Sequence, residues 1–201
     1  MKKILTTLVI MLGVYSLAQA QNGKTEFGVG IGYNSSYVSA GNSYQNTDAI
    51  GGFNVAVSVD HYFSDAWSVK IKPTYDQKGW ANGFLDLGTK QIDNVDFKLT
   101  YITVPITANW HFGRTRNWYL DFGPYVGFLT SATESYTGSD MKSSFSSTDG
   151  GLALGIGVKI PVSDKLKLYF EYDGQGGVVN VFQSGSTVLN TRGAINVGIN
   201  F

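Results

Sequence analysis

The sequence contains no cysteine, only two histidines and four prolines among its 201 residues. The absence of cysteine excludes disulfides, and it also excludes a lipoprotein anchored through an N-terminal cysteine. Two separated histidines without cysteine do not provide the ligand cluster that holds zinc. We therefore expect no disulfide, no bound metal and no cofactor.

Charged residues are also scarce, since Asp, Glu, Lys and Arg make up 15% of the chain and balance to a formal net charge of 0. Nucleic-acid-binding domains usually carry a marked basic excess, so nucleic acid is not an expected partner. In contrast, 14% of the residues are aromatic and 25 are glycine. This composition favours a β protein in contact with lipid over a soluble sandwich.

The first twenty residues have the three parts of a secretory signal peptide. Lys2 and Lys3 precede an apolar run over residues 4–17, and Ala18-Gln19-Ala20 follows. The run is shorter than the ~20 residues that a membrane-spanning helix needs, which argues against an N-terminal anchor. We expect residues 1–20 to be removed and residues 21–201 to form one domain.

Beyond residue 20 no convincing helical period occurs, and apolar and polar residues alternate with a period of two in eight segments. This alternation predicts strands over residues 24–35, 51–63, 66–77, 97–112, 117–131, 150–161, 165–175 and 190–201. The last segment alternates most regularly and ends on the aromatic Phe201. An apolar outer face and a C-terminal Phe are typical of the closing strand of a bacterial outer-membrane barrel.

The faces of these strands differ in charge, because the residues placed on the outer faces are apolar and the charges fall on the inner faces. A single Lys or Arg facing lipid near mid-bilayer costs roughly 2–4 kcal/mol, so an uncharged outer face suits a membrane barrel. The inner charges are Glu26, Asp60, Lys70, Lys72, Asp76, Asp121, Lys159, Lys167, Glu171, Asp173 and Arg192.

Five positive and six negative charges inside a narrow barrel should pair, because an unpaired buried charge is costly. Eight strands enclose a space that side chains can fill or that holds one small ligand. We therefore expect a closed or narrow lumen, with glycines making room for Lys70, Lys72 and the inner tyrosines. The alternative is a polar channel or a small-ligand carrier.

The connections alternate between short ones, near residues 64–65, 113–116 and 162–164, and long ones, near 36–50, 78–96, 132–149 and 176–189. Short periplasmic turns and long extracellular loops are typical of outer-membrane barrels. This pattern places both termini on the periplasmic side.

Large apolar residues in two of the long connections could mark a partner site or could pack at the barrel mouth. They are Trp80, Phe84, Leu85, Leu87, Val179, Val181 and Phe182. Because loops on a rigid scaffold often carry function, an extracellular protein or glycan is the partner class we expect.

The two histidines, His61 and His111, lie on strands that are not expected to be neighbours, and the long loops contain no histidine. A nucleophile, a base and an orienting group must lie within hydrogen-bond reach for hydrolysis. We therefore expect interfacial histidines and a protein that is not an enzyme.

Four segments resemble the PorT-like outer-membrane β-barrel family: residues 99–112 (LTYITVPITANWHF), 123–132 (GPYVGFLTSA), 149–157 (DGGLALGIG) and 194–201 (AINVGINF). The resemblance covers the whole chain after residue 20. It implies an all-β, eight-stranded antiparallel up-and-down barrel in the outer membrane of a Gram-negative bacterium. In such proteins the barrel-assembly machinery reads the terminal strand, here ending at Phe201.

Three functions remain open from the sequence. A structural barrel that binds a partner through its loops ranks first, and a narrow channel or small-ligand carrier ranks second. A lipid-modifying enzyme ranks third because the histidines are separated.

Overall fold

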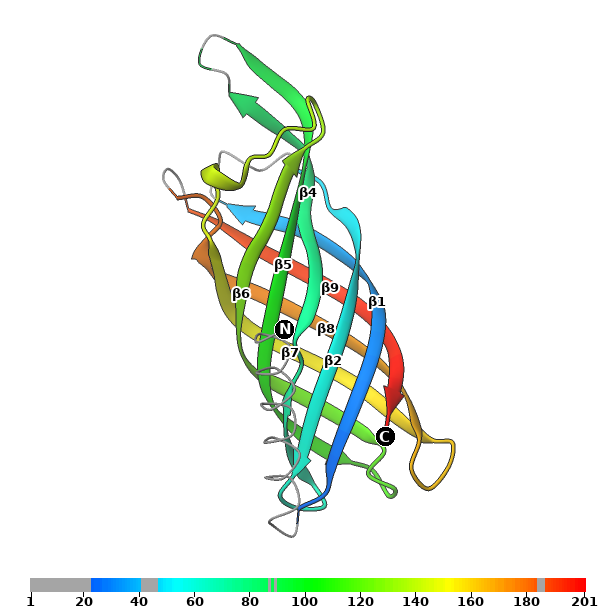
Figure 1. Ribbon diagram of the computed structural model, residues 1–201. Helices are drawn as coiled ribbons and strands as arrows, with labels where there is room; N and C mark the ends of the chain where they lie inside the picture. The colour runs from blue at the N-terminus through cyan, green and yellow to red at the C-terminus, as the bar shows by residue number, and fades with distance from the viewer. Residues whose placement is uncertain (1–22, 41–46, 87, 89, 184–186) are drawn as a thin grey trace, which may run out of the picture.

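The computed structural model describes residues 23–40, 47–86, 88, 90–183 and 187–201, so the predicted signal peptide lies outside the described residues. These residues form a tilted antiparallel barrel (Figure 1). The strands are β1 (Thr25–Ala40), β2 (Ile50–Tyr62), β3 (Trp67–Ile71), β4 (Thr74–Asp86), β5 (Gln91–Phe112), β6 (Trp118–Glu134), β7 (Thr148–Pro161), β8 (Lys167–Asn180) and β9 (Val188–Asn200). A single turn of 3-10 helix, η2 (Lys142–Ser144), lies between β6 and β7.

The nine strands occupy eight positions in the ring. Apart from β3 and β4, strands that follow one another in sequence pair with each other, and β1 pairs with both β2 and β9, which closes the barrel. Strands β3 and β4 share one position, because each pairs with β2 on one side and with β5 on the other. The eight-stranded antiparallel barrel predicted from the alternation is therefore confirmed.

The segment predicted as one strand over residues 66–77 is interrupted at Lys72 and Pro73, which corrects that boundary. Proline has no N–H to donate to a strand ladder, so it breaks the pairing where it occurs. The chain stays in place because the N–H of Lys72 donates to the Pro105 carbonyl at 3.2 Å and the Pro73 carbonyl accepts from Val57 at 3.0 Å.

Side chains alternate between the outer surface and the interior along the strands of the ring, as pleated strands require, with breaks near Gly79 in β4 and at Thr130 and Ser131 in β6. In β7, Leu152 and Leu154 are 67% and 63% exposed, while the intervening Ala153 is buried. Lys98 in β5 is an exception to the uncharged outer faces, and it is exposed where β5 extends past the ring. Among the described residues, no helix has the length and apolar character to cross a bilayer.

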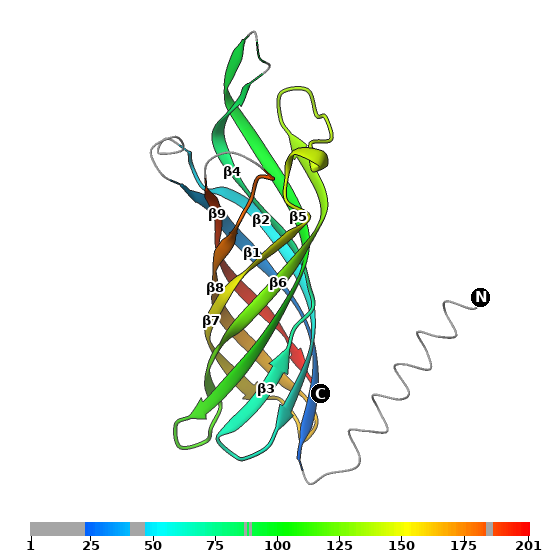
Figure 2. The same ribbon diagram turned by 90° about the vertical axis from the view of Figure 1, so that its left-hand side faces the viewer.

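The two ends of the barrel differ (Figure 2). At one end, here called the turn end, lie the connections over residues 63–66, 113–117 and 162–166, together with residue 25 and Phe201. The exposed aromatics Phe63, Trp67, Trp110 and Trp118 surround this end. At the other end, the loop end, exposed Tyr33, Phe53, Tyr75, Phe128 and Tyr172 point outward. Two aromatic bands flanking an apolar wall are what a membrane barrel requires.

The segment over residues 78–96, expected to be a loop, is instead a hairpin that continues β4 and β5 beyond the ring (Figures 1 and 2). Its pairing runs out to Asp86 and Gln91 and changes register around Gly83. Asn82 and Asn94 have positive φ angles of 54° and 60°, which asparagine tolerates better than most residues. The prediction of a long loop was wrong because Gly79 and the two asparagines break the alternation without ending the strands.

The C-terminal residue is tied to the first strand. Phe201 and Phe27 exchange two backbone hydrogen bonds of 2.8 and 2.9 Å, and their rings stack with centroids 6.4 Å apart. The terminal aromatic therefore belongs to the seam that closes the barrel.

Candidate functional site

The interior is filled by ion pairs arranged in layers, beginning near the turn end. Lys159 donates to Glu26 at 2.9 Å and to Asp60 at 2.7 Å, and Lys167 also donates to Glu26. The hydroxyl of Tyr62 donates to Glu26 at 3.2 Å and accepts from Lys159 at 2.8 Å. Strands β1, β2, β7 and β8 each contribute to this layer, so it crosslinks opposite walls of the barrel.

The middle layer joins two lysines of the β3 and β4 position to acids on β6 and β8. Lys70 donates to Asp121 and to Glu171, both at 2.7 Å. Lys72 donates to Glu171 and, at 2.8 Å, to Asp173. All five side chains are at most 11% exposed, so the charges face one another in the buried interior of the barrel.

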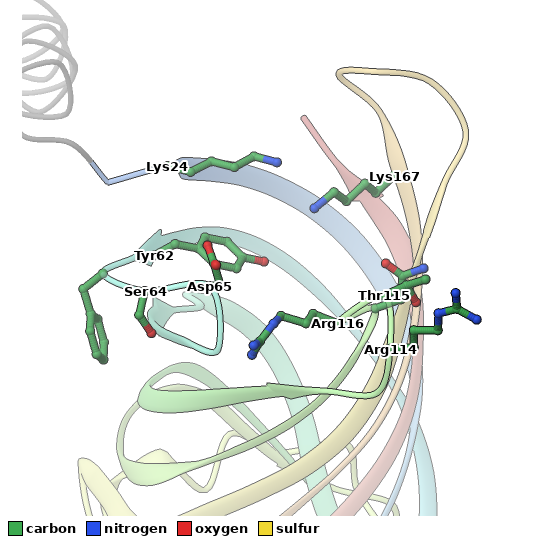
Figure 3. Close-up of a pocket in the computed structure, with 10 residues that line it drawn as sticks. Lys24, Tyr62, Ser64, Asp65, Arg114, Thr115, Arg116 and Lys167 are labelled. Carbon is green, nitrogen blue, oxygen red and sulfur yellow. The ribbon is translucent and has the colours of Figure 1, made fainter.

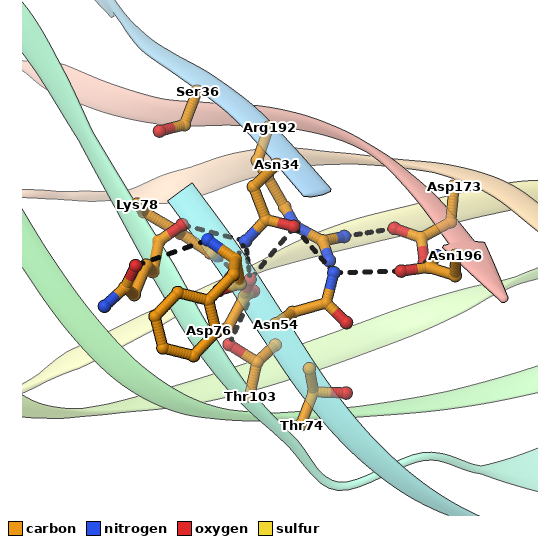
Figure 4. A network of polar contacts seen from close by, with 12 residues as sticks. Asn34, Ser36, Asn54, Thr74, Asp76, Lys78, Thr103, Asp173, Arg192 and Asn196 are labelled. Atoms are coloured by element: carbon orange, nitrogen blue, oxygen red, sulfur yellow. Dashed lines mark hydrogen bonds and ion pairs between the residues drawn. The ribbon is translucent and has the colours of Figure 1, made fainter. Parts of the chain in front are cut away.

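The upper layer is centred on Asp76 (Figure 4). Arg192 lies 3.1 Å from Asp76 through Nε and pairs with Asp173 through Nη1. Asn34 donates to Asp76 at 2.8 Å, and Asn54 links Asn34 to Asn196 at 2.7 and 2.9 Å. The asparagines thus connect the upper ion pairs into one network.

Two luminal charges escaped the sequence reasoning. Lys78 donates to Asp149 at 2.9 Å, and both side chains are at most 2% exposed. They lay in segments assigned to loops. The period of two could have identified both residues. Lys78 lies two positions after the inward-facing Asp76 in β4, and Asp149 lies at the same alternating positions as the inward-facing residues of β7. The structure brings all eleven charges predicted to face inward into this same interior.

Glycines on the inner faces make room for tyrosine rings. A Cβ at Gly30 would lie 1.9 Å from the hydroxyl oxygen of Tyr169, and one at Gly157 would lie 2.4 Å from that of Tyr119. The hydroxyl of Tyr119 in turn donates to Glu171 at 2.8 Å. The expectation that glycines accommodate inner tyrosines is therefore confirmed by the close approach.

Little space remains between these side chains. The cavity lined by Lys70, Lys72, Tyr119, Tyr169 and Glu171 has a volume of about 10 Å³. A cavity of roughly 10–15 Å³ is about the least that holds one water molecule. At this level the interior is therefore filled almost entirely by side chains.

An apolar cluster closes the loop end above the ion pairs. Trp80, Phe97 and Phe145 form its centre, with Trp80 stacked on Phe97 at 4.8 Å and edge-on to Phe145 at 6.0 Å. Phe182 stacks on Phe145 at 5.1 Å, and the Val181 carbonyl accepts from Ser146 at 2.8 Å. Val181 and Phe182, which directly follow β8, thus pack onto the cluster at the loop end.

The apolar residues that the sequence predicted as candidates for partner binding differ in how far they are buried in this cluster. Trp80 and Val181 are buried at its centre, which removes them from any exposed surface. Leu85 and Phe182 pack against it and are partly buried, as are Phe84 and Val179. Leu87 lies outside the described residues. Most of these side chains thus pack at the barrel mouth.

The two histidines do not come together. His111, expected at the interface, is buried inside the barrel, where its Nε2 lies 2.9 Å from Ser68 Oγ and its ring packs on Tyr62. His61 lies on the outer face and contacts Thr25 Oγ1 at 2.8 Å. Within the described part of the chain, no group of three or more His, Asp or Glu side chains could hold a metal ion.

Comparisons with known proteins agree with this architecture. The profile of the outer membrane protein beta-barrel domain family matches residues 18–183. The curated proteins include no match to the chain.

Among solved structures, the chain is similar to Neisserial surface protein A at 18% identity, over 90% of this chain and 98% of that one, with a TM-score of 0.55. It is similar to OprG from Pseudomonas aeruginosa at 12% identity, over 88% and 94% of the two chains, with a TM-score of 0.51. AlkL in lipid bilayers matches at 10% identity over 91% and 92%, with a TM-score of 0.50. At these identities the likeness shows the fold alone.

Proposed function

Because the chain belongs to the family of outer membrane protein beta-barrel domains, and so lies in the outer membrane of a Gram-negative bacterium, we propose that it is a closed barrel of structural and interaction type. In this proposal the turn end and both termini face the periplasm, and the loop end faces the outside. The short turns at one end and the projecting hairpin at the other support this orientation.

The filled interior is the observation that carries the proposal. Three layers of buried ion pairs and an apolar cluster lie in series along the barrel axis, and the cavity within the middle layer holds about 10 Å³. A barrel filled in this way supplies rigidity rather than a passage, so its loop-end surface is where we place an interaction with other molecules.

The partner surface we propose is the β4–β5 hairpin, which projects farther than the other connections (Figure 2). The charges at the loop end describe the partner it would accept. Among the described residues there, the acidic side chains that are not buried, Asp48, Asp86, Asp93, Asp96 and Asp140, outnumber Lys90, Lys98 and Lys142. This acidic surface would repel sulfated or phosphorylated polymers and suits a neutral glycan or a neutral to basic protein.

The C-terminal strand suggests a second partner, which would bind the chain before it folds. We propose that the barrel-assembly machinery reads the β9 strand ending at Phe201 before β9 pairs with β1. In the folded barrel the same strand is fully engaged with β1 and β8, so this partner would be released on closure.

The hairpin can be removed without touching the ring. We would replace residues 84–93 by Asn-Gly, a sequence suited to a two-residue hairpin turn, and measure binding to protein and neutral-glycan arrays in nanodiscs. The matched control keeps the hairpin length and carries Asp86→Asn and Asp93→Asn. We expect the shortened barrel to fold, as judged by heat-modifiable migration, and to lose binding that the native chain shows. Binding that is unchanged by the deletion, or absent from the native chain, would refute the role of the hairpin.

A further inference from the structure

The mouth of the barrel at the turn end is a basic hollow. It has a volume of about 480 Å³ and is lined by residues that we call the turn-end vestibule: Lys24, Tyr62, Phe63, Ser64, Asp65, Arg114, Thr115, Arg116, Asn117 and Lys167. Four of them are cationic and only Asp65 is acidic. A hollow of roughly 300–1,000 Å³ is large enough for a small ligand.

The vestibule is assembled from four separate parts of the chain (Figure 3). Lys24 precedes β1, Lys167 begins β8, and the remaining residues belong to the β2–β3 and β5–β6 turns with their flanking strand ends. Arg116 reaches from its turn toward the β2–β3 turn, whereas Arg114 points away from it (Figure 3). The folded barrel thus brings positive side chains from separate segments together around one opening.

The positive charge of the vestibule is only partly neutralised by the protein. Lys24 and Lys167 both contact Glu26, which also accepts from Lys159, so three ammonium groups share one carboxylate. Neither Arg114 nor Arg116 has an ion-pair partner among the described residues. An incoming anion would therefore meet arginines that have no existing ion pair to give up, beside two lysines that share Glu26.

The backbone of Arg116 provides an independent observation. Its φ angle is +52°, in the left-handed region where side chains other than Asn and Gly are uncommon. Glycine would fit this turn position with less strain. Residues held in such conformations cluster at ligand sites, and here the conformation directs a guanidinium over the opening.

We propose that the turn-end vestibule binds a phosphate group. The planar guanidinium of Arg116 is suited to two parallel hydrogen bonds with phosphate oxygens, and Lys24 and Lys167 add point charges. A group carrying up to two negative charges matches several unneutralised cations better than a single carboxylate does. The vestibule also adjoins the exposed ring of Phe63 and the neighbouring Trp118, at the depth where lipid headgroups lie. The phosphate could therefore come from a phospholipid headgroup or from a soluble phosphate compound.

The test uses the variant Lys24→Gln/Arg116→Gln, which removes two cations while Glu26 keeps Lys159 and Lys167. The control Lys90→Gln/Lys98→Gln removes the same charge at the loop end. One arm measures binding of inorganic phosphate by calorimetry to barrels in zwitterionic detergent. The other compares phosphatidylglycerol with phosphatidylcholine retained after purification, by native mass spectrometry. Heat-modifiable migration shows that each variant folds.

We expect the native barrel to bind in at least one arm and the vestibule variant to bind about tenfold more weakly, because charge-assisted hydrogen bonds are lost. Phosphate binding in the detergent arm would show that the vestibule binds a soluble phosphate compound without any phospholipid. Selective retention of phosphatidylglycerol without phosphate binding would identify a lipid headgroup. Binding in neither arm, or an equal loss in the vestibule and loop-end variants, would overturn the proposal.

Discussion

At the scale of single residues, the interior depends on carboxylates that each serve more than one cation. Glu171 accepts from Lys70 and Lys72, and Glu26 accepts from Lys159 and Lys167. Removing one member of a buried ion pair is strongly destabilising because the remaining charge stays buried without compensation. A shared carboxylate keeps its second cation, so the cost is greatest where the lost cation also served a carboxylate that has no other cation.

Lys159 is the clearest case, because it joins Glu26 and Asp60 across the barrel. We expect Lys159→Met to lower the free energy of unfolding by about 3–5 kcal/mol, since two buried carboxylates lose their common partner. Urea unfolding of barrels in lipid vesicles measures this loss. The control Lys98→Met, at an exposed position, should change the value by no more than about 0.5 kcal/mol. The double variant Lys159→Met/Asp60→Asn should recover part of the loss, and a Lys159→Met barrel as stable as the control would contradict the argument.

Gly30 is the second residue whose role follows from a distance. A methyl group there would lie 1.9 Å from the hydroxyl of Tyr169 and 3.0 Å from the Val197 carbonyl, so Tyr169 must shift. We expect Gly30→Ala to cost about 1–3 kcal/mol of unfolding free energy, as overpacking of a filled interior usually does. Adding Tyr169→Phe should restore part of the loss. Gly176→Ala, where the new methyl meets nothing within 4 Å, is the matched control. Equal effects at the two glycines would rule out the steric explanation.

At the scale of elements, the alternation of residues was enough to predict the ring but not its extensions. The period of two predicted the position of each strand and which of its faces points inward. It does so because lipid requires apolar side chains on the outside, whereas the interior holds charged ones. It failed at Lys72 and Pro73, where proline interrupts the ladder, and around Gly79 and Asn82, where a bulged hairpin continues. Packing at the barrel mouth was one of two possibilities that the sequence offered for the apolar loop residues, but the contacts themselves, such as Trp80 with Phe145, join segments far apart in the chain and could not be predicted.

The β6–β7 connection contains an element that should respond to acid. The carboxylate of Glu134, beyond the loop-end aromatics, accepts from the N–H groups of Tyr136, Thr137 and Ser139 at 2.5–3.1 Å and from the Thr137 hydroxyl. These bonds, that of the Thr137 side chain foremost, lower the pKa of Glu134 from 4.5 to about 2.

A lowered pKa means that this turn is stabilised in full above pH 4.5 and loses that stabilisation as the pH falls through about 2. Amide proton chemical shifts of Thr137 and Ser139 in nanodiscs should follow that titration, with a midpoint near pH 2. Glu134→Gln should abolish it and speed hydrogen exchange at the same amides. A midpoint near 4.5, the usual value for glutamate, would show that the carboxylate is not held by these bonds.

At the scale of the whole molecule, the barrel combines closure with an uneven distribution of charge. In the closed barrel that we propose, ion pairs fill the lumen and the apolar cluster covers its loop end, which makes two seals in series. The turn-end vestibule is basic, whereas the charged side chains among the described residues at the loop end are mainly acidic. A sealed barrel with different ends can contact one class of molecule on each side of the membrane while passing nothing between them.

This double seal predicts that the refolded barrel does not conduct. In planar bilayers at high salt we expect no current steps above the leak, because the cavity at the middle layer has a volume of only about 10 Å³. The variant Trp80→Ala/Phe145→Ala should also stay silent: it opens the apolar cluster, but the ion pairs of Lys70 and Lys72 remain below it. An open porin reconstituted in parallel provides the positive control, and heat-modifiable migration shows that the silent barrels are folded. Reproducible steps from the native barrel that change on Lys70→Gln would show a path through the ion-paired layer and restore the channel as the function.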